Sequence, residues 1–151
     1  MSDYHLAQLN IAQMNYTIDD PAMADFVAAL DPVNAAAEAA PGFVWRLKTD
    51  EGDATGIRIY GDETLLVNMS VWESVESLKQ FIADLDHGAI MRRRAEWFSR
   101  MDQPGTVLWW VPAGHVPDVA EAERKLDALR ASGATAEAFD LANPYPPPGG
   151  G

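Results

Sequence analysis

The run from Leu65 to Trp72 alternates between apolar and polar side chains, and this alternation constrains the fold more than any other feature of the chain. Because successive side chains of a β-strand point to opposite faces, one face of this strand is aliphatic and the other carries Asn68, Ser70 and Trp72. Ligand cavities are commonly lined by aromatic groups with a few polar anchors. The run therefore predicts a strand whose amide and indole face is the first candidate for a binding site.

The other elements are predicted from periodicity and from the residues that begin and end helices. The pair Asp20-Pro21 is typical of a helix start, and Asp31-Pro32 farther along predicts a kink or a second short helix. Pro41-Gly42 is typical of a helix end. The expected strands span 5–14, 43–48, 64–72 and 106–111, and the expected helices span 19–40, 74–86, 89–101 and 118–133.

The order strand, helix, two strands, helix, strand is that of a ferredoxin-like split βαβ fold of the α+β class. It predicts a four-stranded antiparallel sheet with helices over one face, and the helix at 118–133 is an extra C-terminal element. Because no helix remains for the second face, and large exposed apolar patches are rare on monomers, we expect a homodimer whose sheets face each other in a dimeric α/β barrel. An open, solvated face is the alternative. The side chains expected on this second face are Gln8, Asn10, Val44, Arg46, Asn68, Ser70, Trp72, Leu108 and Trp110.

Composition narrows the class of protein. The 151 residues are 48% hydrophobic, which is enough for one core, and we place one domain at 1–141 and a flexible Pro/Gly-rich tail at 142–151. The net charge of -12 disfavours a nucleic-acid surface, because phosphate binding relies on clustered lysine and arginine. The absence of cysteine, of a signal peptide and of a long apolar run predicts a cytoplasmic protein without a membrane partner.

Charged side chains outside the alternating strand are further candidates for a site. Arg94 shares an apolar helical face with Trp97, where an unpaired charge is costly, so either an internal carboxylate or an anionic ligand is expected to neutralise it. His87 lies between two helical stretches and His115 follows the last strand, and either is a candidate base because histidine titrates near neutral pH. The three histidines show no metal-ligand spacing, so no metal site is predicted.

Five segments, HLAQLNIA, GFVWRL, LVNMSVWES, RRRAEWF and LWWVPAGH, resemble a bacterial family of unknown function, DUF3291. The resemblance covers the chain from His5 to about Phe139. This family is similar to the dimeric α/β-barrel superfamily, which includes antibiotic biosynthesis monooxygenases, haem-degrading monooxygenases and small stress-associated proteins. The resemblance implies a fold more strongly than it implies a reaction.

The resemblance also implies roles for single residues. Quinone-forming monooxygenases of the superfamily use a strand asparagine followed four residues later by a tryptophan, and Asn68 and Trp72 match this pair. Haem-degrading members carry an asparagine on the first strand, which Asn10 matches. Their iron-ligating histidine is matched by Met91, so haem binding here would depend on His87, four residues earlier.

We therefore expect a small-molecule enzyme that resembles cofactor-independent monooxygenases acting on aromatic or polyketide-like substrates. The alternatives are a non-catalytic ligand-binding or stress-associated dimer, and a haem-binding enzyme of the same barrel, in which Phe81 matches the aromatic residue that presses on haem. The expected monooxygenase-like enzyme requires no cofactor. The expected catalytic residues are Asn68, Trp72 and His87, and the expected substrate-binding residues are Asn10, Arg46, Ser70, Phe81, Arg94, Trp97, Trp110 and His115.

Overall fold

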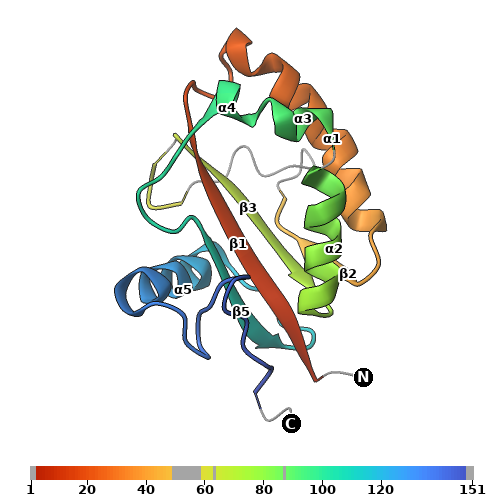
Figure 1. Cartoon of the computed structure of the whole chain (residues 1–151), viewed down its shortest axis with the longest axis vertical. Coiled ribbons are helices and arrows are strands. Elements are labelled where there is room, and N and C mark those ends of the chain that lie inside the picture. Colours follow the sequence, from red (N-terminus) through yellow and green to blue (C-terminus); the bar gives the residue numbers. More distant parts are fainter. Residues whose placement is uncertain (1–2, 49–58, 63, 87, 149–151) are drawn as a thin grey trace.

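The computed structural model describes residues 3–48, 59–62, 64–86 and 88–148, whose arrangement is shown in Figure 1. The strands are β1 (Tyr4–Met14), β2 (Phe43–Arg46), β3 (Leu65–Trp72), β4 (Phe98–Ser99) and β5 (Thr106–Pro112), and the helices are α1 (Ala24–Ala39), α2 (Val75–Asp86), α3 (Ala89–Arg92), α4 (Arg94–Trp97) and α5 (Val119–Ser132). β3 lies between β2 and β1, and β1 pairs on its other side with β5 and, at its end, with the short β4. These pairings are antiparallel, so the predicted ferredoxin-like sheet with an added C-terminal helix is confirmed.

Capping side chains begin two of the helical segments where the sequence predicts them. The carboxylate of Asp20 caps a short 3-10 helix, Pro21–Met23, which leads into α1. Asp118 caps α5 by accepting a hydrogen bond from the backbone N–H of Glu121 at 2.8 Å. Among the described residues, no helix combines the length and the apolar composition that a membrane span requires.

Two predictions about the helices are corrected. Of the two alternatives given for Asp31-Pro32, the second short helix is excluded, because α1 continues through Pro32. The stretch 89–101 is not one helix: α4 ends at Trp97, and the extended residues Phe98 and Ser99 then pair with the end of β1. This pairing joins segments that are far apart in the sequence, and helical periodicity within 89–101 carries no information about it.

An irregularity in β2 changes which of its side chains share a face. The register along β3 shifts between Phe43 and Trp45, so that Phe43 lies opposite Trp72 and Arg46 lies opposite Ser70. A bulge inserts one residue and thereby breaks the strict alternation of faces. Arg46 therefore lies on the amide and indole face as expected, whereas Val44, which was expected beside it, is an exposed residue within the bulge.

The aliphatic face of the sheet is covered by the chain itself, which corrects the expectation of a face without a helix. Leu126 and Leu129 of α5 belong to one core cluster with the aliphatic side chains of β1, β3 and β5. Ile59, from the connection between β2 and β3, is completely buried in the same cluster. The added helix thus lies on the side of the sheet opposite α1 and α2, as Figure 1 shows. A helix outside the split βαβ pattern provides this cover.

The amide and indole face lies beneath the other helices. Near one end of the sheet, Leu78 and Phe81 of α2 pack around Trp72. Near the other end, Phe26 of α1 and Trp97 of α4 pack around Met14. The polar side chains between these two clusters therefore face the helix layer, and not a second sheet as predicted.

Tyr60 joins the connection between β2 and β3 to α5. Its hydroxyl donates to Oδ1 of Asp127 at 2.8 Å, and its backbone N–H donates to Glu123 at 2.7 Å. Burial and the hydrogen bond to the Asp127 carboxylate raise the pKa of Tyr60 to about 12. The folded-state pKa of Tyr60 lies above the ordinary tyrosine value, so the protonated hydroxyl stabilises the folded protein. This stabilisation is fully present below the ordinary pKa and is lost as the pH rises through about 12.

In an ultraviolet titration, we expect a late tyrosinate phase near pH 12 from Tyr60. Tyr60→Phe should remove this late phase. A late phase that persists in Tyr60→Phe would assign it to another tyrosine and contradict this prediction.

The segment after α5 packs against the domain beyond the predicted boundary at 141. Phe139 and Leu108 exchange two backbone hydrogen bonds of 2.7 and 2.9 Å. Tyr145 lies against Phe139, with ring centroids 5.8 Å apart, and its carbonyl accepts the indole N–H of Trp110 at 2.9 Å. Tyr145, from the segment 142–151, thus completes an aromatic cluster with Phe139 and Trp110.

Candidate functional site

A stripe of polar side chains crosses the middle of the sheet on the side that faces α1 and α2. It consists of Gln8 and Asn10 of β1, Asn68 and Ser70 of β3, and Thr106 of β5, and we call it the amide stripe. The strand register places Gln8 opposite Ser70 and Asn10 opposite Asn68. Apolar clusters flank the stripe at both ends, so polar groups are concentrated at the centre of this face.

Gln8 organises the β3 side of the amide stripe. Its Nε2 donates to Oδ1 of Asn68 and to Oγ of Ser70, each at 2.9 Å. The Ser70 hydroxyl also accepts the indole N–H of Trp72 at 2.8 Å. Gln8 and Ser70 are only 7% and 6% exposed, and their hydrogen bonds offset the cost of burying polar groups. The network holds Asn68 by its carbonyl oxygen, and within the described residues its Nδ2 has no hydrogen-bond partner.

Asn10 is held by its amide nitrogen, whereas Asn68 is held by its carbonyl oxygen. Its Nδ2 donates to Oγ1 of Thr106 at 2.7 Å, and its Oδ1 accepts no hydrogen bond from any described residue. Asn10 and Asn68 are both exposed, although they lie on the two neighbouring strands β1 and β3 in the interior of the sheet. The protein thus leaves the space above this pair open to solvent, and a small molecule can reach both amides there.

Arg46 adds a positive charge beside the amide stripe. It lies opposite Ser70, its side chain is 12% exposed, and its guanidinium lies 3.7 Å from Oε1 of Glu38 on α1. The Glu38 side chain is 44% exposed, so water weakens the attraction between the two charges. The pair links β2 to α1 and brings one arginine to this face of the sheet.

Trp72 supports the stripe from within the core. Its ring is 1% exposed and lies between Phe43, in an edge-on contact at 5.5 Å, and Phe81, stacked at 5.2 Å. Its N–H is already bound to Ser70. Trp72 therefore reaches the amide stripe through Ser70 and reaches the helix layer through Phe81.

A groove of about 460 Å³ runs between α1 and α2, and Phe81 lies on its wall. Its lining is mostly alanine, proline and larger apolar side chains, and Asp84 is the one charged residue among the described residues that line it. Ala37 is the only buried residue of α1, so this alanine-rich helix exposes much of its surface. The stacked pair Phe81 and Trp72 separates the groove from Ser70 of the amide stripe.

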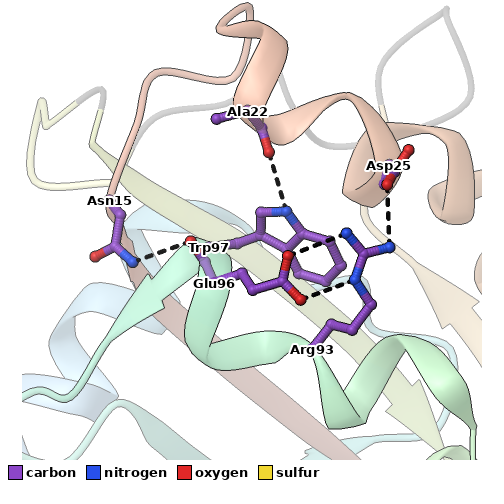
Figure 2. Close-up of polar contacts among 6 residues, drawn as sticks. All are labelled: Asn15, Ala22, Asp25, Arg93, Glu96 and Trp97. Carbon is purple, nitrogen blue, oxygen red and sulfur yellow. Dashed lines mark hydrogen bonds and ion pairs between the residues drawn. The ribbon is translucent and has the colours of Figure 1, made fainter.

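The segment from α3 to β4 is joined to the 3-10 helix Pro21–Met23 and to the beginning of α1, as Figure 2 shows. Trp97 is 1% exposed and donates its indole N–H to the carbonyl of Ala22 at 3.1 Å. Arg93 forms two hydrogen bonds with Glu96, at 2.8 and 3.0 Å, and an ion pair with Asp25 of α1 at 3.0 Å. The Arg93 guanidinium also lies over the Trp97 ring, 4.8 Å from its centroid. Arg93 thus joins α4 to α1 at the edge of the helix layer.

We expect acid to weaken this junction. The hydrogen bond from Arg93 holds the pKa of Glu96 below its ordinary value. Since the folded-state pKa is depressed, the stabilisation is present above the ordinary glutamate pKa and is lost as the pH falls through the folded value. The melting temperature of the wild type should therefore exceed that of Glu96→Gln at neutral pH, and the difference should shrink in acid and at high salt. A difference that stays constant over this range would contradict the prediction.

Arg94 does not lie in the apolar stripe where the sequence placed it. It is exposed at the start of α4, because the predicted helix breaks at Arg93. The arginine that packs on an aromatic ring and meets carboxylates is Arg93. Arg94 is therefore not the charge within the apolar stripe, because the helix phase changes between α3 and α4.

The remaining predicted site residues lie away from the centre of the amide stripe. Trp97 is buried in the cluster around Met14, and Trp110 packs beside Phe139 and Tyr145. His115 is exposed in the loop after β5 and contacts Glu121 at 2.7 Å, and Glu121 in turn accepts the indole N–H of Trp109 at 2.8 Å. His115 therefore belongs to the α5 side of the sheet.

His87 lies outside the described residues, so its expected role as a base stays a prediction. The positions that the resemblance links to haem do not fit a haem site here. Asn10 is bound to Thr106, Phe81 is stacked on Trp72, and Met91 stands at the position that matches the iron-ligating histidine. In the part of the chain that the structure describes, no three side chains of histidine, aspartate or glutamate are grouped as metal ligands.

Gln8 and Thr106 are the members of the stripe that the predicted site lacks. Alternation alone places Gln8 on the face of Asn10, two residues away, and strand pairing adds Thr106. Their importance depends on hydrogen bonds to Asn68 and Asn10, which join residues 60 and 96 positions apart. Strand alternation in the sequence therefore indicated the face on which Gln8 lies, but it could not identify Asn68 as the hydrogen-bond partner of Gln8.

A family model described as "Domain of unknown function (DUF3291)" matches residues 5–151. Among solved structures, the cofactor-independent oxygenase SnoaB from Streptomyces nogalater is similar at a TM-score of 0.44 and 15% identity, covering 76% of this chain and 97% of that chain. Proteins assigned as antibiotic biosynthesis monooxygenases from Chloroflexus aurantiacus and Nitrosomonas europaea have TM-scores of 0.44 and 0.41, identities of 15% and 12%, and coverage of 76% of this chain and 98% and 94% of theirs. No curated protein matches the chain significantly.

Proposed function

The chain belongs to the DUF3291 family, and from this premise together with its amide stripe we propose that it is a small-molecule enzyme resembling cofactor-independent monooxygenases. The observation that carries the proposal is the state of Asn68. Its carbonyl oxygen is bound by Gln8, its side chain is exposed on an interior strand, and its Nδ2 has no partner among the described residues. Asn68 is therefore a fixed donor that faces a space open to a ligand.

A fixed donor suits a reaction in which charge develops on a substrate oxygen. In cofactor-free oxygenation, a methylene carbon beside a carbonyl loses a proton, and the resulting anion reduces molecular oxygen. The methylene and O2 become a carbonyl and water, so the substrate supplies the electrons. In the proposed reaction, Nδ2 of Asn68 donates to the oxygen that carries the negative charge of the anion.

The buried part of the amide stripe supports this donor. Rotation of the Asn68 amide breaks the 2.9 Å hydrogen bond from Gln8, and Gln8 is itself anchored to Ser70. A donor held in place before the reaction needs no reorganisation when the charge forms. His87 stays a proposed base, since in the sequence it separates α2 from α3, next to the groove residue Gly88.

Oxygen uptake with anthrone as substrate tests the proposed function. We expect the protein, without added metal or cofactor, to raise oxygen consumption above the spontaneous rate in buffer and to form anthraquinone in equal amount. Tight anthrone binding without product would instead support the non-catalytic ligand-binding alternative. A Soret band on addition of haem, lost in His87→Ala, would support the haem alternative.

The homodimer and the cytoplasmic location stay predictions. The amide and indole face, which was expected to meet a second sheet, lies beneath α1 and α2, and the aliphatic face is covered by α5 and by Ile59. A dimer of this chain would therefore need a different contact surface. Light scattering at several protein concentrations measures the oligomeric state directly.

A further inference from the structure

Asn10 and Asn68 form a pair of amides with opposite hydrogen-bonding character. They lie directly opposite each other on β1 and β3 and share a face of the sheet. Asn68 uses its carbonyl oxygen to accept from Gln8, and Asn10 uses its Nδ2 to donate to Thr106. The structure places Nδ2 of Asn10 on the hydroxyl of Thr106 and Oδ1 of Asn68 on Nε2 of Gln8. What remains for a ligand is a donor on Asn68 and an acceptor on Asn10.

The spacing of the pair limits what can bind both amides at once. Side chains directly opposite each other on antiparallel strands have Cβ atoms about 4.5–5.5 Å apart. A ligand that contacts both therefore carries an acceptor and a donor within a few ångströms of each other. Both side chains are exposed, so a planar molecule can lie above them without displacing a protein group.

We infer that this pair selects a planar compound with a protonated hydroxyl beside a carbonyl, with the carbonyl on Asn68 and the hydroxyl on Asn10. The inference rests on the proposed function for the role of Asn68 and adds the class of substrate. A hydroxyl that donates to Oδ1 of Asn10 satisfies an acceptor that no described residue satisfies. A methyl ether at the same position removes the donor and places a methyl group against this oxygen.

The same pair disfavours a carboxylate as the bound group. A carboxylate offers acceptors only, so one of its oxygens would face Oδ1 of Asn10 without a hydrogen. Arg46 provides positive charge on this face, but it lies beside Ser70 and is paired with Glu38 of α1. If the pair binds a neutral hydroxyl and carbonyl, a carboxylate should bind weakly. If this face instead binds anions, a carboxylate should bind more tightly.

Equilibrium binding under nitrogen tests the inference without turnover. The probes are 1-hydroxyanthraquinone, 1-methoxyanthraquinone and anthraquinone-1-carboxylate, followed by quenching of tryptophan fluorescence. We expect the wild type to bind the hydroxy probe at least about tenfold more tightly than either other probe, which is the free energy of about one good hydrogen bond. Equal binding of the three probes, tighter binding of the carboxylate, or no binding of any probe up to its solubility limit would overturn the inference.

Variants of Asn10 identify the source of the preference. Asn10→Leu should reduce the hydroxy-to-methoxy ratio to near one, whereas Asn10→Asp keeps an acceptor at this position and should retain the ratio. Thr106→Val leaves Asn10 in place but removes the group that fixes its amide, and the ratio should fall as well. A ratio that survives in Asn10→Leu contradicts the assignment, and melting temperatures show that each variant is folded.

These measurements separate the inference from the proposed function. A hydroxyl preference that depends on Asn10, in a protein that consumes no oxygen, would retain the ligand class and reject the monooxygenase. Anthrone oxidation by a protein that does not distinguish the hydroxy from the methoxy probe would support the monooxygenase and reject the ligand class.

Discussion

Asn68→Ala is expected to lower kcat for anthrone oxidation by about 10²–10³-fold, the typical cost of removing one oxyanion donor. The effect follows from the position of Nδ2, which has no partner among the described residues and faces the open space above β1 and β3. The substitution removes this donor and one hydrogen bond from Gln8, while Gln8 keeps its bond to Ser70. Stopped-flow absorbance of the anthraquinone product gives kcat and KM separately.

Asn68→Asp is the matched control for shape. It keeps an oxygen for the Gln8 donor and replaces Nδ2 by a second oxygen, so that a negative charge faces the developing negative charge of the substrate. We expect kcat of Asn68→Asp to fall at least as far as that of Asn68→Ala, with a melting temperature close to the wild type. If Asn68→Ala keeps kcat within threefold of the wild type, Asn68 is not the catalytic donor.

Trp72→Ala is expected to lower the free energy of unfolding by about 3–5 kcal/mol, the range for large aromatic truncations in a core. Trp72 is 1% exposed and packs with Leu6, Leu78 and Leu108 in the cluster beneath α2. Removal of its ring leaves a cavity, ends the stacking with Phe81 and takes one donor from Ser70. Urea unfolding followed by circular dichroism measures the change.

Trp72→Phe separates packing from hydrogen bonding. It keeps an aromatic ring between Phe43 and Phe81 but removes the N–H that binds Ser70. The loss of stability should be smaller than in Trp72→Ala, because Ser70 still accepts from Gln8. A loss below about 1 kcal/mol for Trp72→Ala would mean that the cluster closes over the missing ring, contrary to the close packing expected of a core.

The composition of the amide and indole face was predictable because strand alternation is a local property. Asn68, Ser70 and Trp72 share a face whatever surrounds the strand, and the same rule places Gln8 with Asn10. The rule failed at Val44, where a bulge in β2 adds one residue. The rule also does not predict how exposed each side chain is. It therefore grouped the buried Trp72 with the exposed Asn68 as if both could contact a ligand.

The prediction for Arg94 shows a second limit of local patterns. Helical periodicity over 89–101 assumes one continuous helix, and the register is lost once α4 ends and β4 begins. The cause lies far away in the chain, because the end of β1 pairs with β4 and the carbonyl of Ala22 binds Trp97. Arg93, one position earlier, forms the ion pairs with Asp25 and Glu96.

The sequence by itself determined strands β1, β2, β3 and β5, the order of the split βαβ pattern, helix caps such as Asp20 and Asp118, and the two chemically different faces of the sheet. These features depend on residues close together in the chain. The tertiary structure alone decided which layer covers which face. Leu126 and Leu129 of α5 cover the aliphatic side, and the opposite side therefore faces α1 and α2, with Asn10 and Asn68 of the amide stripe exposed. That choice depends on apolar contacts and hydrogen bonds between distant segments, and alternation within a strand is the same whichever layer lies above it.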